Sequence, residues 1–497
     1  METRKPHAVL LASPGLGHLI PIIELGKRLV THHGFIVTVF VVTVDTCART
    51  QLLMKSSNSA GLLSIFHIPS VHISTLLPTT SDIVTKIKVM MQESLPYLRS
   101  AISEMKTAPA ILVVDLFGTK AFLIAEEFNM LKYVFDTSTA WFLAVTTYAP
   151  ALDSKAFDEH VNEEKPMSIP GCRPLPFKDT FEIFFNRSTP EYEQFMAMAA
   201  EITTADGILV NTWEDLESTT LKALRDKKLL RPFVRAPVYP IGPVARSVRF
   251  PATGDLVSDW LDRQPNKSVI YVSFGSGGTL PCKQMTELAW GLELSHQRFL
   301  WVVRPPMEND PSGCFFTNFN DNEGGHYLHL DFLPVGFLTR TKGRGLVVPL
   351  WTSQPEILGH PSVGGFLSHC GWNSSLESLV NGVPMIAWPL FAEQKMNAAM
   401  LTELGVAVRS KELAASGVAS REEIGTMVRE LMEENEGETM RKRVEKLKRS
   451  AEEAVREGGS SYNTLSQLTA EWEKKVFGTL NHLTIVPLLE NWINHTF

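Results

Sequence analysis

The feature that most constrains the fold of this chain is a repeated alternation of short apolar segments with amphipathic ones. Segments 7–13 (HAVLLAS) and 35–43 (FIVTVFVVT) are mostly apolar, and segment 20–34 between them has helical periodicity and ends at a glycine. Apolar strands separated by helices are typical of a parallel sheet covered by helices on both faces. Residues 45–105 are polar and irregular, so their order is not predicted. The strand pattern continues in segments 110–117, 131–138 and 206–213.

A break in this alternation divides the chain into two halves. Residues 239–255 are rich in proline, glycine and small side chains, as expected of a linker. Residues 307–330 are rich in Gly, Asn and Asp and are expected to form a surface loop. The sequence therefore predicts an α/β fold of two doubly wound, Rossmann-like domains that face a cleft. In the second half, strands are expected in segments 268–276, 298–306, 345–351, 363–367 and 383–391, and a helix in 283–297.

The expected domain boundaries follow from these segments. The N-terminal domain spans residues 1–245, a linker covers 246–257, and the C-terminal domain spans 258–460. A helix over 461–478 is expected to pack back on the N-terminal domain. Residues 479–497 form a tail to which no role is assigned.

Charge and composition exclude several classes of function. The chain of 497 residues has a formal net charge of −7, so it lacks the basic field that nucleic acid or an anionic membrane requires. Its longest apolar run, residues 35–44, is too short for the roughly 20 residues that span a membrane. The five cysteines are scattered without metal-ligand spacing and suit a reducing compartment. The first residues, METRKPH, do not resemble a signal peptide. We therefore expect a monomeric cytoplasmic protein.

One short bend concentrates hydrogen-bonding side chains between a strand and a helix. The stretch SHCGWNSSLES (368–378) follows an apolar segment and precedes residues with the spacing of a helix face. The N-terminus of such a helix presents free N–H groups and the positive end of its dipole, which attract phosphate. Gly371 permits a tight turn, and Asn373 and Ser374 are residue types that cap helices. His369 adds a hydrogen-bond donor, and Glu377 suits sugar hydroxyls. Taken alone, the stretch is better explained as a capped helix start without a ligand.

A longer pattern around this bend resembles a known family. Residues 351–394 read WTSQPEILGHPSVGGFLSHCGWNSSLESLVNGVPMIAWPLFAEQ. The opening Trp, the Gln at the fourth position, HPSVGGF, HCGWNS, GVPM and the closing acid–Gln pair resemble the 44-residue nucleotide-sugar box of plant UDP-dependent glycosyltransferases (family 1, GT-B fold). Within that family, VVDLFGT, TAWFLA, IPGCRPLP and VSFGSGGTL most resemble the hydroquinone and monolignol (coniferyl alcohol type) glucosyltransferases. The resemblance ends near residue 475.

The resemblance implies a UDP-sugar site in the C-terminal domain and an acceptor site in the N-terminal domain. A closing Gln in the box is associated with glucose, so UDP-glucose is the expected sugar donor and no cofactor is expected. The box departs from the family at Thr352 and Ser353, where Ala-Pro is usual, and we expect at most a loss of affinity there. The residues implied are Trp351 for uracil, Gln354 and Glu377 for the ribose, Ser276, His369, Asn373 and Ser374 for the diphosphate, and Trp372, Glu393 and Gln394 for the sugar.

Two titratable residues follow strands of the N-terminal half. His18 stands in the loop SPGLGHLIP after the first strand, and Asp115 ends the strand ILVVD, so both are expected at the same edge of a parallel sheet. A carboxylate bonded to one imidazole nitrogen fixes the tautomer and leaves the other nitrogen as a base. In the resembling family these positions form the catalytic dyad. We therefore expect His18 to deprotonate an acceptor hydroxyl that attacks the anomeric carbon in line and gives an inverted β-glucoside.

The leaving group and the acceptor raise two further expectations. The sequence has no Asp-x-Asp pair to hold a metal between phosphate oxygens, so transfer is expected to be metal-independent, with residues 369–374 stabilising the leaving-group charge. The acceptor is expected to be a small phenol of the hydroquinone or monolignol type. Phe117 and Trp141 are candidates to contact its ring, although ordinary core packing explains them equally well, and Tyr192 is a weaker candidate.

Three alternative functions are open to a chain of this kind. The first is a glycosyltransferase of the same fold with another donor sugar or a non-phenolic acceptor. The second is a non-catalytic UDP-sugar-binding protein, which the presence of both His18 and Asp115 disfavours. The third is a nicotinamide oxidoreductase, which is disfavoured because VSFGSGGTL and GLGHLI both lack the third glycine of the dinucleotide fingerprint.

Overall fold

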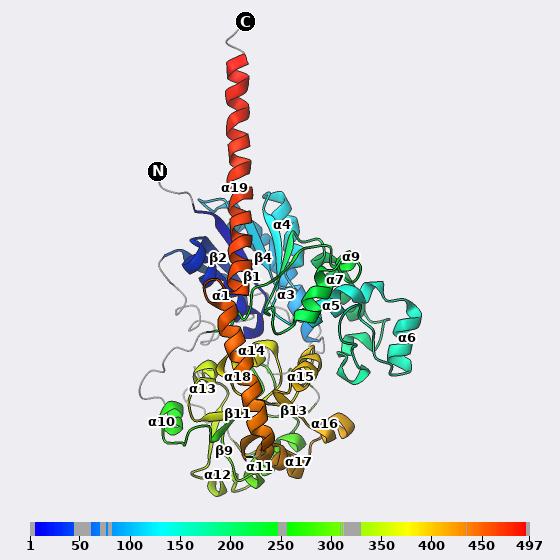
Figure 1. The fold of residues 1–497 in the computed structure, drawn as a ribbon, viewed down its shortest axis with the longest axis vertical. Helices are drawn as coiled ribbons and strands as arrows, with labels where there is room; N and C mark the ends of the chain where they lie inside the picture. Colours follow the sequence, from blue (N-terminus) through cyan, green and yellow to red (C-terminus); the bar gives the residue numbers. More distant parts are fainter. Residues whose placement is uncertain are drawn as a thin grey trace.

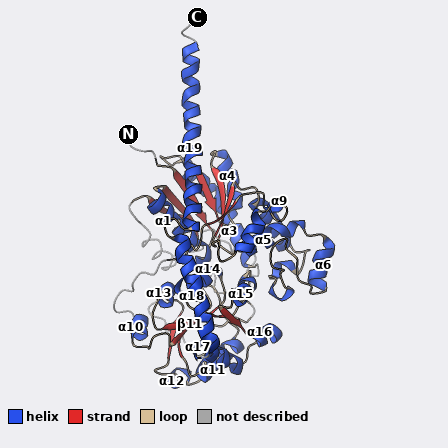
Figure 2. Ribbon diagram, viewed as in Figure 1, coloured by secondary structure: helices blue, strands red, loops and turns tan. Residues whose placement is uncertain are grey.

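The computed structural model describes residues 5–43, 61–69, 76–77, 82–246, 256–308, 310, 312, 330–433 and 435–493, with the backbone alone for 414, 416 and 477–493. The predicted linker (246–257) and the predicted surface loop (307–330) lie largely outside these ranges. The described residues form two parallel sheets flanked by helices, one above the other along the long axis of the molecule (Figures 1 and 2). This architecture confirms the predicted fold class.

The N-terminal domain contains the upper sheet of Figure 1, in which the described strands have the order β3-β2-β1-β4-β5-β6-β7. All its pairs are parallel, and β1 and β4 are aligned from Ala8 opposite Ile111 to Leu11 opposite Val114. The chain order reverses between β1 and β4, so the segments that follow these strands diverge and leave a crevice at their carboxyl ends. The strands are β1 (His7–Ala12), β2 (Ile36–Val42), β3 (Leu63–Ile68), β4 (Ile111–Val114), β5 (Leu131–Asp136), β6 (Gly207–Val210) and β7 (Val238–Pro240).

The C-terminal domain repeats this plan with the described strand order β10-β9-β8-β11-β12-β13. These pairs are also parallel, and the order reverses between β8 and β11. Each sheet therefore has one switch point, and both are places where a ligand can bind. The strands are β8 (Val269–Ser273), β9 (Arg298–Val303), β10 (Gly345–Pro349), β11 (Val363–Ser368), β12 (Met385–Ala387) and β13 (Ala407–Arg409).

Helices connect the strands and cover both faces of each sheet (Figure 2). Those of the N-terminal domain are α1 (Leu16–His33), α3 (Ile83–Ser103), α4 (Phe122–Glu127), α5 (Ala140–Tyr148), α6 (Ser154–Asn162), α7 (Pro190–Ile202), α8 (Ser218–Arg225) and α9 (Arg231–Val234). Those that follow are α10 (Leu256–Asp262), α11 (Cys282–Leu294), α12 (Phe337–Arg340), α13 (Gln354–Leu358), α14 (Trp372–Asn381), α15 (Gln394–Glu403), α16 (Lys411–Ser416), α17 (Arg421–Glu433), α18 (Asn435–Val455) and α19 (Ser460–Ile493).

The apolar strands are buried because each face of the sheet meets a different core. Along β1, Val9 and Leu11 belong to a core that includes residues of α3, α4 and α5. The intervening Ala8 and Leu10 belong to a second core that includes residues of α1 and α19. Successive side chains of a strand point to opposite faces, so a strand with both faces covered must be apolar along its whole length.

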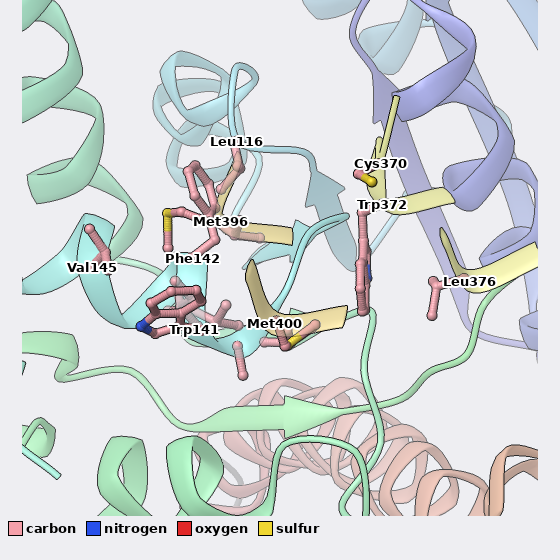
Figure 3. Packing of buried hydrophobic residues seen from close by; sticks show 14 of the residues in the cluster. Leu116, Trp141, Phe142, Val145, Cys370, Trp372, Leu376, Met396 and Met400 are labelled. Atoms are coloured by element: carbon pink, nitrogen blue, oxygen red, sulfur yellow. The ribbon is translucent and has the colours of Figure 1, made fainter. Parts of the chain in front are cut away.

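The first of these cores continues from the N-terminal into the C-terminal domain. In Figure 3, Trp141 and Phe142 of α5 lie near Met396 and Met400 of α15, and all four side chains are buried. Trp372, at the start of α14, belongs to the same cluster. The two domains therefore share apolar packing as well as the chain that connects them.

Helix α3 was not predicted, although its N-terminal signal is present in the sequence. Asp82 caps the helix by accepting hydrogen bonds from the N–H groups of Val84 and Thr85 (2.8 and 3.0 Å). The buried face includes Met90 and Leu98, and Pro96 lies within the helix. Proline is disfavoured inside helices, so its presence obscures a pattern that packing against the sheet stabilises.

The last helix returns the chain to the N-terminal domain. After α18, which packs on the C-terminal domain, the chain turns at Gly458 (φ +82°) and continues as α19. The indole of Trp472 is fully buried between the rings of Phe35 and Tyr133, at centroid distances of 5.9 and 4.9 Å. Helix α19 does not end near residue 478 but continues as one helix to Ile493, beyond the sheet (red in Figure 1).

Candidate active site

A cavity of about 610 Å³ lies between the two domains, at the switch points of both sheets. The segments after β1 and β4 form part of its wall on the N-terminal domain, and those after β8 and β11 face them from the C-terminal domain. The predicted residues that line it are His18, Phe117, Ser276, Trp351, Gln354, His369, Trp372, Asn373, Ser374, Glu377, Glu393 and Gln394.

The strand–helix bend at residues 368–374 leaves the start of α14 open toward the cavity. The N-cap residue is Gly371, and within the described chain no side chain caps the helix. This corrects the expectation that Asn373 and Ser374 act as caps, because both lie inside the first turn. Cys370, just before the cap, has a φ of +63°. The first-turn N–H groups and the positive end of the helix dipole are therefore available to an anion.

The imidazole of His369 is held between two glycines beside this helix start. A Cβ atom on Gly275 would lie 2.4 Å from His369 Nε2, and one on Gly371 would lie 2.5 Å from the same nitrogen. Burial, with a further contribution from the nearby Arg304 guanidinium, lowers the pKa of His369 to about 3. Its Nδ1 has no hydrogen-bond partner among the described residues. His369 is therefore neutral near pH 7 and can serve a bound anion as an uncharged hydrogen-bond donor.

A hydrogen-bonded group connects the start of α13 to α14. The Gln354 amide donates to Ser374 Oγ (2.9 Å) and to Glu377 Oε2 (2.7 Å). Burial raises the pKa of Glu377 to about 7. Trp351 lines the cavity directly after Leu350, whose φ of +66° turns the chain at the end of β10. A buried carboxylate beside an amide is suited to accept hydrogen bonds from sugar hydroxyls.

Two residues of the α14 start bond to the opposite domain. Asn373 Nδ2 donates to the carbonyl of Gly17 (2.6 Å) and Trp372 Nε1 donates to the carbonyl of Asn211 (2.8 Å). The Trp372 side chain is only 3% exposed. It was predicted to face the sugar; Trp372 lines the cavity, but its indole N–H is already bonded across the domain interface. The same helix start thus lines the cavity and joins the domains.

Glu393 and Gln394 line the cavity at the start of α15. Gln394 Oε1 accepts hydrogen bonds from the N–H groups of Leu390 and Phe391 (2.9 and 3.2 Å), which fixes the orientation of its amide. Burial raises the pKa of Glu393, and His18 is near enough to oppose this change electrostatically. Glu393, near the end of segment 351–394, therefore lies close to the His18 imidazole of the N-terminal domain.

His18 and Asp115 meet at the switch point of the N-terminal sheet. His18 Nδ1 lies 3.5 Å from Asp115 Oδ2, and this contact does not reach hydrogen-bond geometry. His18 is the third residue of α1 and not part of a loop as predicted. Asp115 is fully buried and accepts hydrogen bonds from the N–H (2.9 Å) and hydroxyl (2.5 Å) of Ser13 and from the N–H of Phe117 (3.1 Å). These bonds fix the carboxylate behind an imidazole that lines the cavity.

The acceptor candidates divide into one residue that lines the cavity and two that do not. The Phe117 ring packs edge-on against His18 at a centroid distance of 5.3 Å. Trp141 is 1% exposed and packs in the core shown in Figure 3, beneath the Arg173 guanidinium. Tyr192 is buried against Phe157. These placements correct the expectation that Trp141 and Tyr192 contact the acceptor.

Sequence reasoning missed much of the lining because its residues come from separate helices and loops. Three cations were missed, namely Lys88 of α3, Arg246 at the start of the predicted linker, and Arg304. Arg304, which follows β9, is 4% exposed and donates to the carbonyl of Gly278 (3.1 Å). Arg304 was recognisable as a charged residue that ends a strand. The apolar lining residues missed in the N-terminal domain include Ile83, Ile87, Phe142, Phe181, Phe195 and Met198.

None of the groups of His, Cys, Asp and Glu side chains in the described chain brings three or more together in a way that could hold a metal ion. Among the described helices, none is both long and apolar enough to cross a bilayer.

Two doubly wound domains that close over one cavity, with an open helix start on one side and a His–Asp pair on the other, define a transferase of the GT-B type. The chain belongs to the UDP-glucoronosyl and UDP-glucosyl transferase family, whose model matches residues 178–442. It is therefore a UDP-glycosyltransferase.

Individual relatives cover nearly the whole chain. It is 50% identical to an anthocyanidin 3-O-glucosyltransferase 5 from Manihot esculenta, over 95% of this chain and 96% of the relative. It is 44% identical to a hydroquinone glucosyltransferase from Rauvolfia serpentina, over 95% of this chain and 99% of the relative. The crystal structure of TcCGT1 in complex with UDP has a TM-score of 0.89 and 49% identity, covering 95% of this chain and 100% of that one.

Proposed function

We propose that this protein transfers glucose from UDP-glucose to the hydroxyl group of a small phenol, with inversion at the anomeric carbon. The observation that carries the proposal is that the His18 imidazole and the open start of α14 line one cavity from opposite domains. The relatives' names support the choice of glucose and of aromatic hydroxyl acceptors, because two of them are glucosyltransferases for an anthocyanidin and for hydroquinone.

The C-terminal domain is suited to hold the nucleotide sugar. The diphosphate would lie at the start of α14, where the first-turn N–H groups, neutral His369 and Ser276 can donate hydrogen bonds. The uracil would stack on Trp351. The ribose would bond to the pair formed by Gln354 and Glu377, since the carboxylate accepts hydrogen bonds from hydroxyl groups.

The sugar would lie between Gln394 and the N-terminal domain. The carbonyl oxygen of the Gln394 side chain is occupied by two backbone N–H groups, so its amide N–H groups are directed away and can donate to sugar oxygens. Glu393 supplies acceptors beside it. Asn373, which bonds to Gly17 in the other domain, would fix the domains around the sugar rather than hold the phosphates as predicted.

His18 would act as the general base. The acceptor O–H donates to Nε2, the oxygen attacks the anomeric carbon, and the bond between that carbon and the phosphate oxygen breaks on the opposite face. The proton passes to the imidazole, and UDP leaves with the electron pair. Asp115 would stabilise the imidazolium across the 3.5 Å separation, and its bonds to Ser13 hold it in place. An α-linked sugar thereby gives a β-glucoside.

The charge that develops on the leaving diphosphate would be stabilised by groups of the protein. The helix start donates N–H groups from a fixed geometry, and the Arg304 guanidinium is near enough to influence the pKa of His369 beside it. We therefore propose that transfer does not require an added metal. Assays with and without a chelator address this point directly.

The decisive experiment compares catalysis with nucleotide binding. Purified protein with UDP-glucose, hydroquinone or coniferyl alcohol, and EDTA should form a β-glucoside, identified by its anomeric coupling constant. His18→Ala should abolish transfer while UDP still binds by calorimetry. Loss of UDP binding in His18→Ala would contradict the role of His18 as the base. UDP binding by the unaltered protein without transfer to any of a panel of phenols would contradict the proposed activity and favour another donor sugar, a non-phenolic acceptor or a non-catalytic binding protein.

A further inference from the structure

One cation of the N-terminal domain lines the cavity on the side that the proposed acceptor would occupy. Lys88, on α3, lines the cavity and is half-buried. The same domain contributes the apolar residues Ile83, Ile87, Phe195 and Met198 to the lining, together with acidic residues that include Asp82 and Glu191. An ammonium group in such surroundings loses hydration without gaining a polar partner. Burial is the main cause that lowers the pKa of Lys88, to about 8.

The charges near Lys88 balance in number, since Lys88 and Lys120 face Glu201 and Asp82, but they are not all paired directly. Glu201 and Asp82 are near enough to raise its pKa, and Lys120 opposes them. Glu201 already forms an ion pair with Lys120 and accepts a hydrogen bond from Thr119 (2.7 Å). The Asp82 carboxylate caps α3. Within the described chain, Lys88 itself has neither an ion pair nor a hydrogen bond, so its ammonium has no direct partner although Glu201 and Asp82 attract it.

A bound anion would give the Lys88 ammonium a direct partner. A carboxylate on the acceptor could pair with Lys88 in surroundings of low dielectric, where a charge-assisted hydrogen bond is stronger than in water. The reacting hydroxyl of the same molecule must lie at His18, and Phe117 flanks that position with an aromatic ring. The ligand that satisfies both ends has an aromatic hydroxyl at one end and an acidic group at the other.

We propose that Lys88 binds a carboxylate of the acceptor, so that the preferred acceptors are phenolic acids rather than neutral phenols. This inference rests on the proposed function, because it assigns the substrate class of the same cavity. Nothing in the nucleotide-sugar box predicts it, since Lys88 lies on a helix of the other domain.

The test compares an acid with its neutral ester. The acceptors are 4-hydroxycinnamic acid, its methyl ester and hydroquinone, each assayed with UDP-glucose for the unaltered protein, Lys88→Met and Lys86→Met. Lys86 is the matched control, because it is a lysine of the same helix that is absent from the cavity lining. In Lys88→Met we expect KM for the acid to rise roughly tenfold or more, as for the loss of a charged hydrogen bond, with little change for ester and hydroquinone. Lys86→Met should resemble the unaltered protein.

A pH series separates a binding role from a structural one. The preference for acid over ester, measured as the ratio of kcat/KM values, should fall as the pH rises through about 8 in the unaltered protein, because Lys88 loses its charge. The ratio should be low and nearly independent of pH in Lys88→Met. An equal change for acid and ester in Lys88→Met, or a lower Tm as its only effect, would overturn the proposal.

Calorimetric titration of the UDP-loaded protein distinguishes this proposal from the proposed function. Tighter binding of the acid than of the ester, lost in Lys88→Met, would support the role of Lys88 even if no glucoside forms. Transfer to hydroquinone without any preference for the acid would refute the role of Lys88 and leave the glucosyltransferase function intact.

Discussion

Replacing Gly275 by alanine tests whether the site depends on the fixed position of the His369 imidazole. Gly275 has a φ of +75°, and the added Cβ would lie 2.4 Å from Nε2 and 2.5 Å from Cε1 of that ring. Gly371 also lies against this ring, since a Cβ there would be 2.5 Å from Nε2. With alanine at position 275, either the ring must shift or the loops must move apart.

The magnitude has two components. Alanine in the left-handed region costs about 1–2 kcal/mol, and overpacking a filled site costs about 1–3 kcal/mol more. Gly417→Ala isolates the first component, because Gly417 has a φ of +73° and a Cβ there would meet nothing within 4 Å. The difference between the variants, about 1–3 kcal/mol, should appear as a lower free energy of unfolding, as weaker UDP binding, or as both. If it falls entirely on binding, Kd rises about 5- to 150-fold.

Urea unfolding and calorimetric titration with UDP measure the two parts of this difference. The double variant Gly275→Ala/His369→Ala should regain the stability lost to overpacking but should still bind UDP weakly, because the histidine donor is absent. The reasoning is refuted if Gly275→Ala matches Gly417→Ala in both measurements. If Gly275→Ala is less stable than Gly417→Ala, a double variant that unfolds at no higher urea concentration than Gly275→Ala also contradicts the overpacking of His369.

Three further predictions concern stability. Burial raises the pKa of Glu377 to about 7 from an ordinary value of 4.5, so between these values the folded protein binds more protons than the unfolded chain. The free energy of unfolding, measured relative to that of Glu377→Gln, should therefore fall as the pH rises over that range. Urea titrations at pH 5 and 7.5 check this, and a difference between the two proteins that is the same at both pH values would contradict it. Trp372→Phe should lower the free energy of unfolding by about 1–3 kcal/mol, because the buried carbonyl of Asn211 loses its donor, and an unchanged urea midpoint would contradict it. Trp472→Ala should lower it by about 3–5 kcal/mol in the same assay, because the indole is fully buried, and a loss below 1 kcal/mol would show that α19 does not stabilise the fold.

The fold and one wall of the site were predictable because they depend on local patterns. Strands such as β1 and β4 are apolar along their length since both faces are covered, and this reveals a parallel sheet without any knowledge of partners. The proximity of His18 and Asp115 follows from the same rule, because both residues follow strands whose carboxyl ends share an edge. Residues 351–394 are continuous in sequence, so the lining they form was predicted as a group.

The parts that could not be predicted depend on contacts between distant segments. Trp372 was expected to face the sugar, but nothing local in the sequence reveals that its indole N–H bonds to a carbonyl 161 positions away, at Asn211. Trp141 and Lys88 show that the sequence does not separate cavity-lining residues from core residues. Trp141, predicted to contact the acceptor, is in the core, and Lys88, on a helix that was not predicted, lines the cavity. Burial on a helix that packs between two domains leaves no periodic signal that separates lining from core.

The return of the chain through Gly458 into α19 has a mechanical consequence. The polypeptide passes between the domains twice, once through residues 246–256 and again at the turn before α19, whose Trp472 is anchored beside Tyr133. Two covalent connections limit how far the domains can separate, and hinge motion is concentrated in a few residues at the ends of elements, such as those at this turn. Substrate entry and product release would then proceed by a hinged opening of the domains that keeps both connections intact.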